Sequence, residues 1–241
     1  MKKNIVFLSL IGVLVSAVLF CQGSYANQSL LGCEGLLHIP GSAVNKKTEI
    51  STYLGTADGA EGKLLMDFPV FQIFETFLVL NIKQNDVYFN GGVKLPLLKE
   101  LAVFFNADLP SFGNEPKYTY AGIPVTCQIS DDFKIWAYIG FSWDNIIELK
   151  LNPNKWTSTL KHDDGIAVSY KPATGLLLYA ELSFGQEYKD ASFVIKDTCL
   201  GASADVLQGL RIALNYSPDI GNNSITKSIV SVMLTFYSSE K

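Results

Sequence analysis

Hydrophobic and polar residues alternate along most of the chain from residue 48 onward. In the stretch 209–217 the even positions are apolar or aromatic, whereas the odd positions are small, polar or charged. The stretches 87–95, 166–170, 175–184 and 230–236 alternate in a similar way. Because successive side chains of a strand point to opposite faces, each stretch predicts a strand with one apolar and one more polar face.

Further strand candidates lie before and between these stretches, and no segment between them has the periodicity of a helix. They are residues 49–54, 63–68, 75–82, 101–108, 118–130, 134–143, 147–151 and 191–197. Neighbouring strands without helical crossovers must join as hairpins, so the chain predicts an all-β, antiparallel up-and-down meander. From residue 135 to 151 every odd position except Asn145 is apolar, so 134–152 reads as one long strand. With that merger the meander has about 12 strands.

The links between these strands predict two different ends of the sheet. Links 96–100, 131–133 and 172–174 are short and fall on one side, whereas 109–117, 153–164 and 218–228 are long and fall on the other. Short periplasmic turns and long outer loops are typical of outer-membrane barrels. The link 198–208 departs from this pattern, because it is long on the short side.

The direction of the apolar face decides the class of protein. A soluble sandwich or barrel turns it inward, whereas a transmembrane barrel turns it outward to lipid and keeps a polar interior. Small, uncharged residues dominate the polar faces here, and a barrel lumen tolerates them better than a soluble exterior does. Aromatic residues near strand ends resemble the belts at membrane interfaces: Phe104, Phe105, Phe141, Trp143, Tyr179, Phe184, Tyr216, Phe236 and Tyr237. We therefore expect a closed transmembrane β-barrel. A soluble secreted or periplasmic β-protein that binds a ligand or partner is the alternative.

The first residues predict export. Lys2 and Lys3 precede an apolar run over residues 5–20, and Ser24-Tyr25-Ala26 supplies small residues for cleavage after Ala26. A transmembrane anchor and a lipoprotein signal ending at Cys21 are the alternatives. The predicted organisation is a signal peptide over 1–26, an N-terminal segment over 27–47 leading into the barrel, and a single barrel domain over 48–241.

Composition narrows the function classes. Only 17% of the residues are charged and 48% are hydrophobic, which excludes a disordered chain. The formal net charge is −4 and the chain has a single arginine, so no nucleic-acid partner is expected. Cys33, Cys127 and Cys199 allow at most one disulfide, and their wide separation argues against a zinc site built from close cysteine pairs.

No catalytic, cofactor or metal motif emerges from the sequence. The run His162-Asp163-Asp164-Gly165 could form an acid–base or metal cluster, but its composition favours a turn that ends a loop. His38 has no serine or acid nearby in the sequence, so a structural placement is expected. A hydrolase or acyltransferase at the outer rim that uses His162 is a further alternative to the non-enzymatic interpretation.

Charged residues on the polar faces are the candidate site residues. If the apolar faces meet lipid, six of them point into the lumen: Lys94, Glu148, Lys150, Lys171, Glu181 and Arg211. Charges inside a barrel either close it through salt bridges or set its ion selectivity.

The stretch 31–43, Leu-Gly-Cys-Glu-Gly-Leu-Leu-His-Ile-Pro-Gly-Ser-Ala, resembles the opening of a bacterial outer-membrane β-barrel family linked to exopolysaccharide production, the YjbH-like proteins. Gly35, Leu36, Ile39, Pro40 and Ala43 carry the likeness. A second, weaker resemblance to strand-and-turn segments of such barrels covers residues 165–172. The chain is much shorter than typical members, and Gly41 stands where a threonine is usual. The resemblance implies an outer-membrane location but no reaction or ligand.

Together these observations predict a non-enzymatic barrel in the bacterial outer membrane. Its expected role concerns surface polysaccharide or the passage of small solutes, with no cofactor and an undetermined oligomeric state. The expected partners are outer-membrane lipid and the barrel-assembly machinery. That machinery reads a final strand ending in an aromatic residue, and here Phe236-Tyr237 precede four further residues, 238–241.

Overall fold

The computed structural model describes residues 27–28, 34–38, 40–43, 47–55, 61–71, 73–83, 86–109, 118–144, 160–187, 193–218 and 228–237. Two short strands, β1 (Asn27–Gln28) and β2 (Glu34–Gly35), pair with each other. The next strands are β3 (Glu49–Gly55), β4 (Glu61–Val70), β5 (Phe74–Lys83), β6 (Asp86–Leu98), β7 (Leu101–Leu109) and β8 (Tyr118–Gln128). They are followed by β9 (Phe133–Asp144), β10 (Leu160–Ala173), β11 (Leu176–Glu187), β12 (Phe193–Leu207), β13 (Leu210–Ser217) and β14 (Ile229–Tyr237). Among the described residues no helix is both long and apolar enough to span a membrane.

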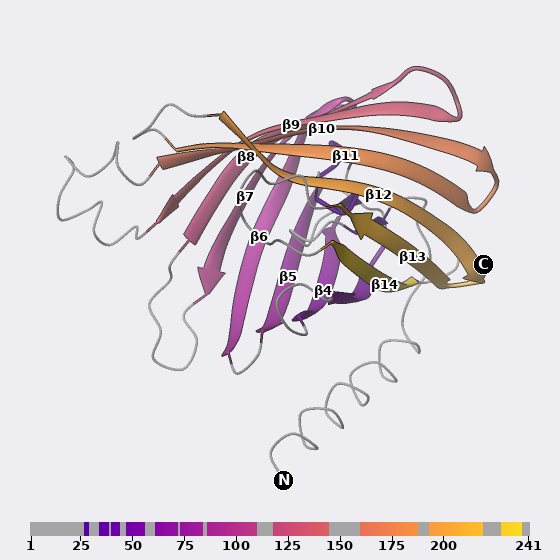
Figure 1. Cartoon of the computed structure of the whole chain (residues 1–241), viewed down its shortest axis with the longest axis horizontal. Helices are drawn as coiled ribbons and strands as arrows, with labels where there is room; N and C mark the ends of the chain where they lie inside the picture. The colour runs from indigo at the N-terminus through magenta and orange to yellow at the C-terminus, as the bar shows by residue number, and fades with distance from the viewer. Residues whose placement is uncertain are drawn as a thin grey trace, which may run out of the picture.

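Strands β3 to β14 form one closed antiparallel barrel. Each strand pairs with the next along the chain, and β14 pairs back with β3 to complete the circle. Figure 1 shows the strands side by side in chain order, from purple β4 to yellow β14. Closure leaves no unpaired edge, as a sheet in lipid requires. The predicted meander of about 12 strands is confirmed.

Two predicted links turn out to be strand. Strand β12 continues to Leu207 and joins β13 through residues 208 and 209, so the long link 198–208 does not exist. All turns at one end of the barrel, after β4, β6, β8, β10 and β12, are therefore short, whereas the links at the other end range from residues 84–85 to residues 145–159. Strand β10 begins at Leu160, so His162-Asp163-Asp164-Gly165 lies in a strand and is not a turn. Gly140 of β9 donates its N–H to Oδ1 of Asp164 at 3.3 Å, which helps to satisfy that carboxylate within the sheet.

The merged strand 134–152 is described only in its first part. Strand β9 runs from Phe133 to Asp144, and Trp143 pairs with Leu160 of β10, so no further strand is inserted between them. Residues 145–159 lie outside the described part of the chain. The predicted signal peptide, residues 1–26, also lies outside it.

The apolar faces of the strands point outward. On β13, Leu214 is 57% exposed, whereas the alternate residues Arg211 and Asn215 are 4% and 3% exposed. Apolar residues at the outward positions of the other strands are also exposed: Leu54, Leu78, Leu95, Phe105, Ile123, Ile139, Val168, Leu178 and Leu200. An apolar outer surface around a polar interior is the arrangement of a transmembrane barrel. The soluble alternative, which requires the opposite arrangement, is therefore wrong.

The predicted aromatic belt is only partly correct. Phe105 and Tyr216 are exposed on the outer surface, but Phe104 and Tyr179 are buried inside the barrel. The ring of Tyr179 covers a glycine of the neighbouring strand, since a Cβ built on Gly201 would lie 2.1 Å from Cζ of Tyr179. Glycine is needed at such positions because the ring occupies the space of a side chain.

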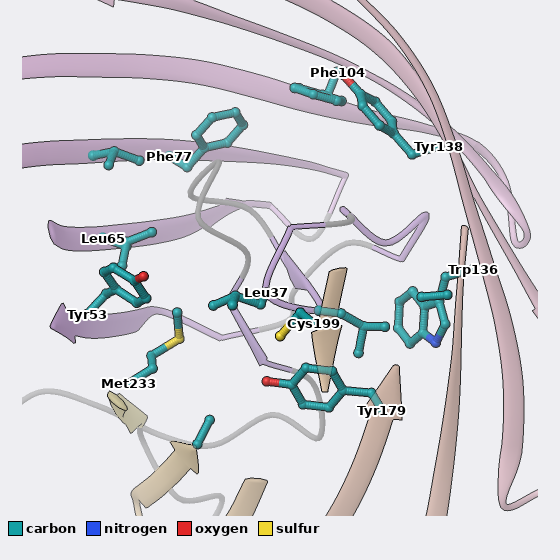
Figure 2. Packing of buried hydrophobic residues seen from close by; sticks show 14 residues of the cluster. Leu37, Tyr53, Leu65, Phe77, Phe104, Trp136, Tyr138, Tyr179, Cys199 and Met233 are labelled. Carbon is teal, nitrogen blue, oxygen red and sulfur yellow. The ribbon is translucent and has the colours of Figure 1, made fainter. Parts of the chain in front are cut away.

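The core of the molecule lies inside the barrel and includes part of the N-terminal segment. Leu36 and Leu37 are 0% and 2% exposed, and they belong to one cluster with buried residues of the barrel wall. Figure 2 shows Leu37 in the middle of this cluster, near Cys199 and Tyr179. The other labelled members are Tyr53, Leu65, Phe77, Phe104, Trp136, Tyr138 and Met233. The described part of the segment, residues 34–38 and 40–43, is hereafter called the inner segment.

Candidate functional site: the barrel lumen

The inner segment folds back on itself, and its second end is held to the barrel by polar contacts. An isolated bridge between Gly35 and Pro40 folds its first part back on itself. Ser42 donates its backbone N–H to Oγ1 of Thr126 at 3.1 Å and its hydroxyl to the carbonyl of Lys99 at 3.2 Å. Lys99 belongs to the short turn between β6 and β7. The inner segment therefore extends from the short-turn end of the barrel towards its centre.

Deeper in the barrel, His38 of the inner segment contacts Glu181 of β11. The backbone N–H of His38 donates to Oε1 and Oε2 of Glu181 at 3.2 and 2.9 Å, and Nδ1 of the imidazole lies 2.9 Å from Oε2. Burial would lower the pKa of His38, but the hydrogen bond and the negative charge of Glu181 outweigh that effect and raise the pKa above its ordinary value. The carboxylate thus holds both the backbone and the ring of His38.

A buried sulfur lies next to this pair. Cys199 of β12 is a free, buried thiol, and its Sγ is 3.9 Å from Oδ1 of Asn215. The hydroxyl of Tyr179 donates to the same oxygen. One donor atom each of His38, Glu181 and Cys199 lie within 4.8 Å of one another. Nitrogen, oxygen and sulfur donors from three separate parts of the chain therefore meet inside the barrel.

A cluster of charged side chains lies near the short-turn end. Glu49 of β3 is in register with Asp67 of β4, and Glu75 of β5 is in register with Lys94 of β6. All four residues are fully buried. Nζ of Lys94 lies 2.7 Å from Oε2 of Glu75, in an ion pair whose two side chains are both 0% exposed. Because a single-layered barrel has nothing packed on its outer face, side chains buried this deeply lie in its interior.

Beyond β14, which separates β13 from β3, Arg211 of β13 is paired with Asp205 of β12. Its Nε donates to Oδ1 of Asp205 at 2.8 Å, and its guanidinium lies 5.5 Å from the ring centroid of Tyr237. Lys171 of β10 is half-buried and lines a small recess together with Asp205 and Arg211. Tyr237 is the last residue of β14, which ends on the side of the barrel where the short turn joins β12 to β13. This second group of charges therefore also lies close to the short-turn end.

The six charges expected in the lumen have different outcomes. Lys94, Glu181 and Arg211 are buried and ion-paired, and Lys171 is half-buried beside Arg211. Glu148 and Lys150 lie outside the described residues, as does the side chain of His162. The structure thus groups the described members with partners from neighbouring strands or from the inner segment.

Sequence reasoning missed several of these partners. Glu75 shares its face of β5 with Phe77 and Val79, which are also buried, so no polar face marked the inward positions of this strand. Glu49 and Asp67 lie near strand ends, where charged residues are usually exposed. The available signal was the alternation of odd and even positions along each strand, which shows which residues share a face. It identifies the inward residues only once the inward face of each strand is known.

No family model and no curated protein sequence matches the chain. Several solved structures do. The KdgM porin in complex with disordered oligogalacturonate has a TM-score of 0.59 at 9% identity, covering 78% of this chain and 98% of the porin. The NanC porin has a TM-score of 0.58 at 9% identity, with the same coverages of 78% and 98%. An outer membrane channel from Pseudomonas putida F1 has a TM-score of 0.57 at 8% identity, covering 80% and 96%.

At these identities the likeness establishes the fold. The chain is a closed twelve-stranded β-barrel of the outer-membrane type. Its outer surface is apolar and therefore faces lipid. Fold and sidedness support the predicted location in the bacterial outer membrane. The matched structures are described as porins and a channel.

Proposed function

We propose that the protein is a small-solute channel whose lumen is partly filled by its own inner segment. The observation that carries this proposal is the set of buried charges and polar groups inside a closed barrel with an apolar exterior. A barrel of twelve strands is wider than the eight-stranded barrels that side chains fill, yet narrower than the 16–18-stranded porins. The inner segment then restricts the remaining space and limits the solutes that pass.

The buried charges favour cations over anions. Among the described residues, the buried acids outnumber the buried bases: Glu49, Asp67, Glu75 and Glu181 against Lys94 and Arg211. Rings of acidic side chains attract cations and repel anions in a narrow pore. The channel is therefore expected to prefer cations and neutral solutes.

Conductance across planar lipid bilayers tests this proposal. The wild-type protein should conduct, and under a potassium chloride gradient its reversal potential should have the sign of a cation preference. Glu49→Gln, which removes a buried carboxylate of the lumen, should reduce that preference. Glu100→Gln, which changes an exposed carboxylate on the turn after β6, should leave it unchanged. An anion preference would contradict the charge argument.

The role of the inner segment is tested separately. Leu37→Asp places a charge in the apolar cluster and should release the segment, because an unpaired charge is costly to bury there. Conductance should rise above that of the wild type. If neither the wild type nor Leu37→Asp conducts, the channel proposal is wrong.

A saccharide is the second candidate for the class of solute. The likeness of residues 31–43 to exopolysaccharide-linked barrels favours it, and the described part of that stretch lies within the barrel. The KdgM neighbour is described with oligogalacturonate, which is acidic, whereas the buried charges here are mainly acidic. We therefore propose neutral saccharides. Swelling of liposomes that contain the protein should be faster in neutral than in acidic oligosaccharides of equal length, and the reverse order would refute this choice.

The barrel-assembly machinery is the proposed partner during insertion. Strand β14 closes the barrel against β3 and ends at Phe236-Tyr237, the aromatic end that such machinery reads. Phe236→Ala should lower the yield of folded barrel in cells more than refolding in detergent. Equal effects in both would show that Phe236 acts only through packing.

A further inference from the structure

Three side chains that belong to no common sequence motif lie close together where the inner segment contacts the barrel wall. They come from the inner segment (His38), from β11 (Glu181) and from β12 (Cys199), and each offers one donor atom within 4.8 Å of the other two. The carboxylate of Glu181 and the thiol of Cys199 are buried, whereas the imidazole of His38 is 22% exposed. Figure 2 shows Cys199 next to Leu37, with Tyr179 on the adjacent strand.

We propose that His38, Glu181 and Cys199 form a binding site for a borderline divalent metal ion, of which Zn²⁺ is the type. Imidazole nitrogen, carboxylate oxygen and thiolate sulfur are the three ligand types that zinc takes in proteins. Hard cations such as Mg²⁺ and Ca²⁺ require all-oxygen sites, so this donor set disfavours them. Three protein ligands leave a fourth tetrahedral position for water or a solute.

The geometry is close to that of a bound site. In a tetrahedral zinc site the donor atoms lie about 3.4 to 3.7 Å apart, as follows from bonds of about 2.0–2.3 Å. Nδ1 of His38 and Oε2 of Glu181 are hydrogen-bonded at 2.9 Å and would separate by about 0.5 Å around an ion, and no pair of the three donors exceeds 4.8 Å. A shift of about 1 Å in the Cys199 rotamer or the inner segment brings the sulfur into bonding range.

The charges of the ligands match those of the ion. A thiolate and a carboxylate carry two negative charges, which a divalent cation neutralises in a buried site. Binding displaces the thiol proton of Cys199 to solvent, and the proton of the His38 imidazole where it is present. The thiol then no longer donates to Oδ1 of Asn215, which keeps the hydroxyl of Tyr179 as its donor.

The carboxylate is already oriented by its surroundings. The backbone N–H of His38 donates to both oxygens of Glu181, and such outer hydrogen bonds are what fix carboxylate ligands in metal sites. With one ligand on the inner segment and two on the wall, a bound ion would fasten the segment in the lumen. The site needs only the docked segment, so it does not depend on whether the barrel conducts.

Metal binding by the folded, reduced full-length chain in detergent tests the proposal. Zinc content after dialysis should reach one ion per chain, whereas Mg²⁺ should not compete. Co²⁺, used as a spectroscopic substitute, should give a sulfur-to-metal charge-transfer band in the near ultraviolet. Cys199→Ser should abolish this band and weaken Zn²⁺ binding at least tenfold, and His38→Gln should weaken it by a similar factor.

The matched control is Cys127→Ser, since Cys127 is also a free thiol but is exposed on β8. It should leave both the band and the affinity unchanged. Each variant is first checked for the gel-mobility shift between unheated and boiled samples. Should Cys199→Ser not fold, X-ray absorption of the zinc-loaded Cys127→Ser variant, which lacks the exterior thiol, decides: one sulfur in the first coordination shell supports the site, and none refutes it.

Two other outcomes would overturn the proposal. One is the absence of stoichiometric zinc in the reduced wild type, which would leave the three residues as a simple anchor for the inner segment. The other is an equal loss of binding in Cys127→Ser and Cys199→Ser, which would place the metal on the exterior thiol.

Discussion

The ion pair between Lys94 and Glu75 provides a quantitative test of how the barrel interior is stabilised. Both side chains are 0% exposed, and Nζ lies 2.7 Å from Oε2. At an effective dielectric constant of about 20 the attraction between two unit charges at this distance is about 6 kcal/mol. The loss of hydration costs several kcal/mol for each ion, so the intact pair contributes little net stability.

Removal of one partner has a much larger effect. Lys94→Met keeps an unbranched side chain one atom shorter than lysine but leaves Glu75 buried without this cation, close to Asp67 and Glu49. Breaking a buried pair in this way costs about 3–5 kcal/mol. The free energy of unfolding of Lys94→Met should therefore fall by about 3 kcal/mol or more, and the midpoint of urea unfolding in lipid vesicles should fall in proportion.

The double variant Lys94→Met/Glu75→Gln distinguishes this explanation from a loss of packing. Because it removes both charges, it should recover most of the stability that Lys94→Met loses. Reversible unfolding of the wild type, both single variants and the double variant gives the coupling energy. A Lys94→Met variant within about 1 kcal/mol of the wild type, or a double variant less stable than Lys94→Met, would refute the reasoning.

Two glycine substitutions test the backbone and the inner packing. Gly209 has φ of +89° in the turn after β12, so Gly209→Ala should lower the free energy of unfolding by about 1 kcal/mol or more. Gly62→Ala, where the new Cβ would be 3.8 Å from its nearest neighbour, should have a smaller effect in the same unfolding assay. Gly201→Ala places a Cβ against the ring of Tyr179 and should cost about 1–3 kcal/mol. Adding Tyr179→Leu should recover part of that loss, and strictly additive effects would show that the ring does not oppose the new methyl group.

Most of the barrel could be predicted because alternation is a local property. Every strand from β3 to β14 overlaps a segment that the sequence indicated, including β9 after the merger that reduced the count. The main exception is the second half of β12, which was expected to be a link. Its residues include Gly201, Ala202, Ser203 and Ala204, which have low strand propensity. They lie in a strand that pairs with β11 on one side and β13 on the other, and Tyr179 of β11 packs over Gly201; local composition reveals neither.

The candidate site could be predicted much less completely. Parity along the strands indicated Lys94, Glu181 and Arg211, but not the residues that they contact. His38 and Glu181 are 143 positions apart, and their contact requires the inner segment to be inside a closed barrel. His38 was therefore assigned no partner, and the wide spacing of the cysteines argued against a metal site. Both inferences used distance along the chain, which closure of the barrel makes irrelevant.

The sequence by itself determined which residues share a face of each strand, because the direction of a side chain follows from the backbone geometry of one strand. From this it determined the antiparallel meander and indicated an apolar exterior. Only the tertiary structure decided which residues of different strands lie opposite one another and what occupies the interior. Register, closure and the position of residues 34–43 depend on all twelve strands together, so the buried contacts of Lys94, His38 and Cys199 appear only in the assembled barrel.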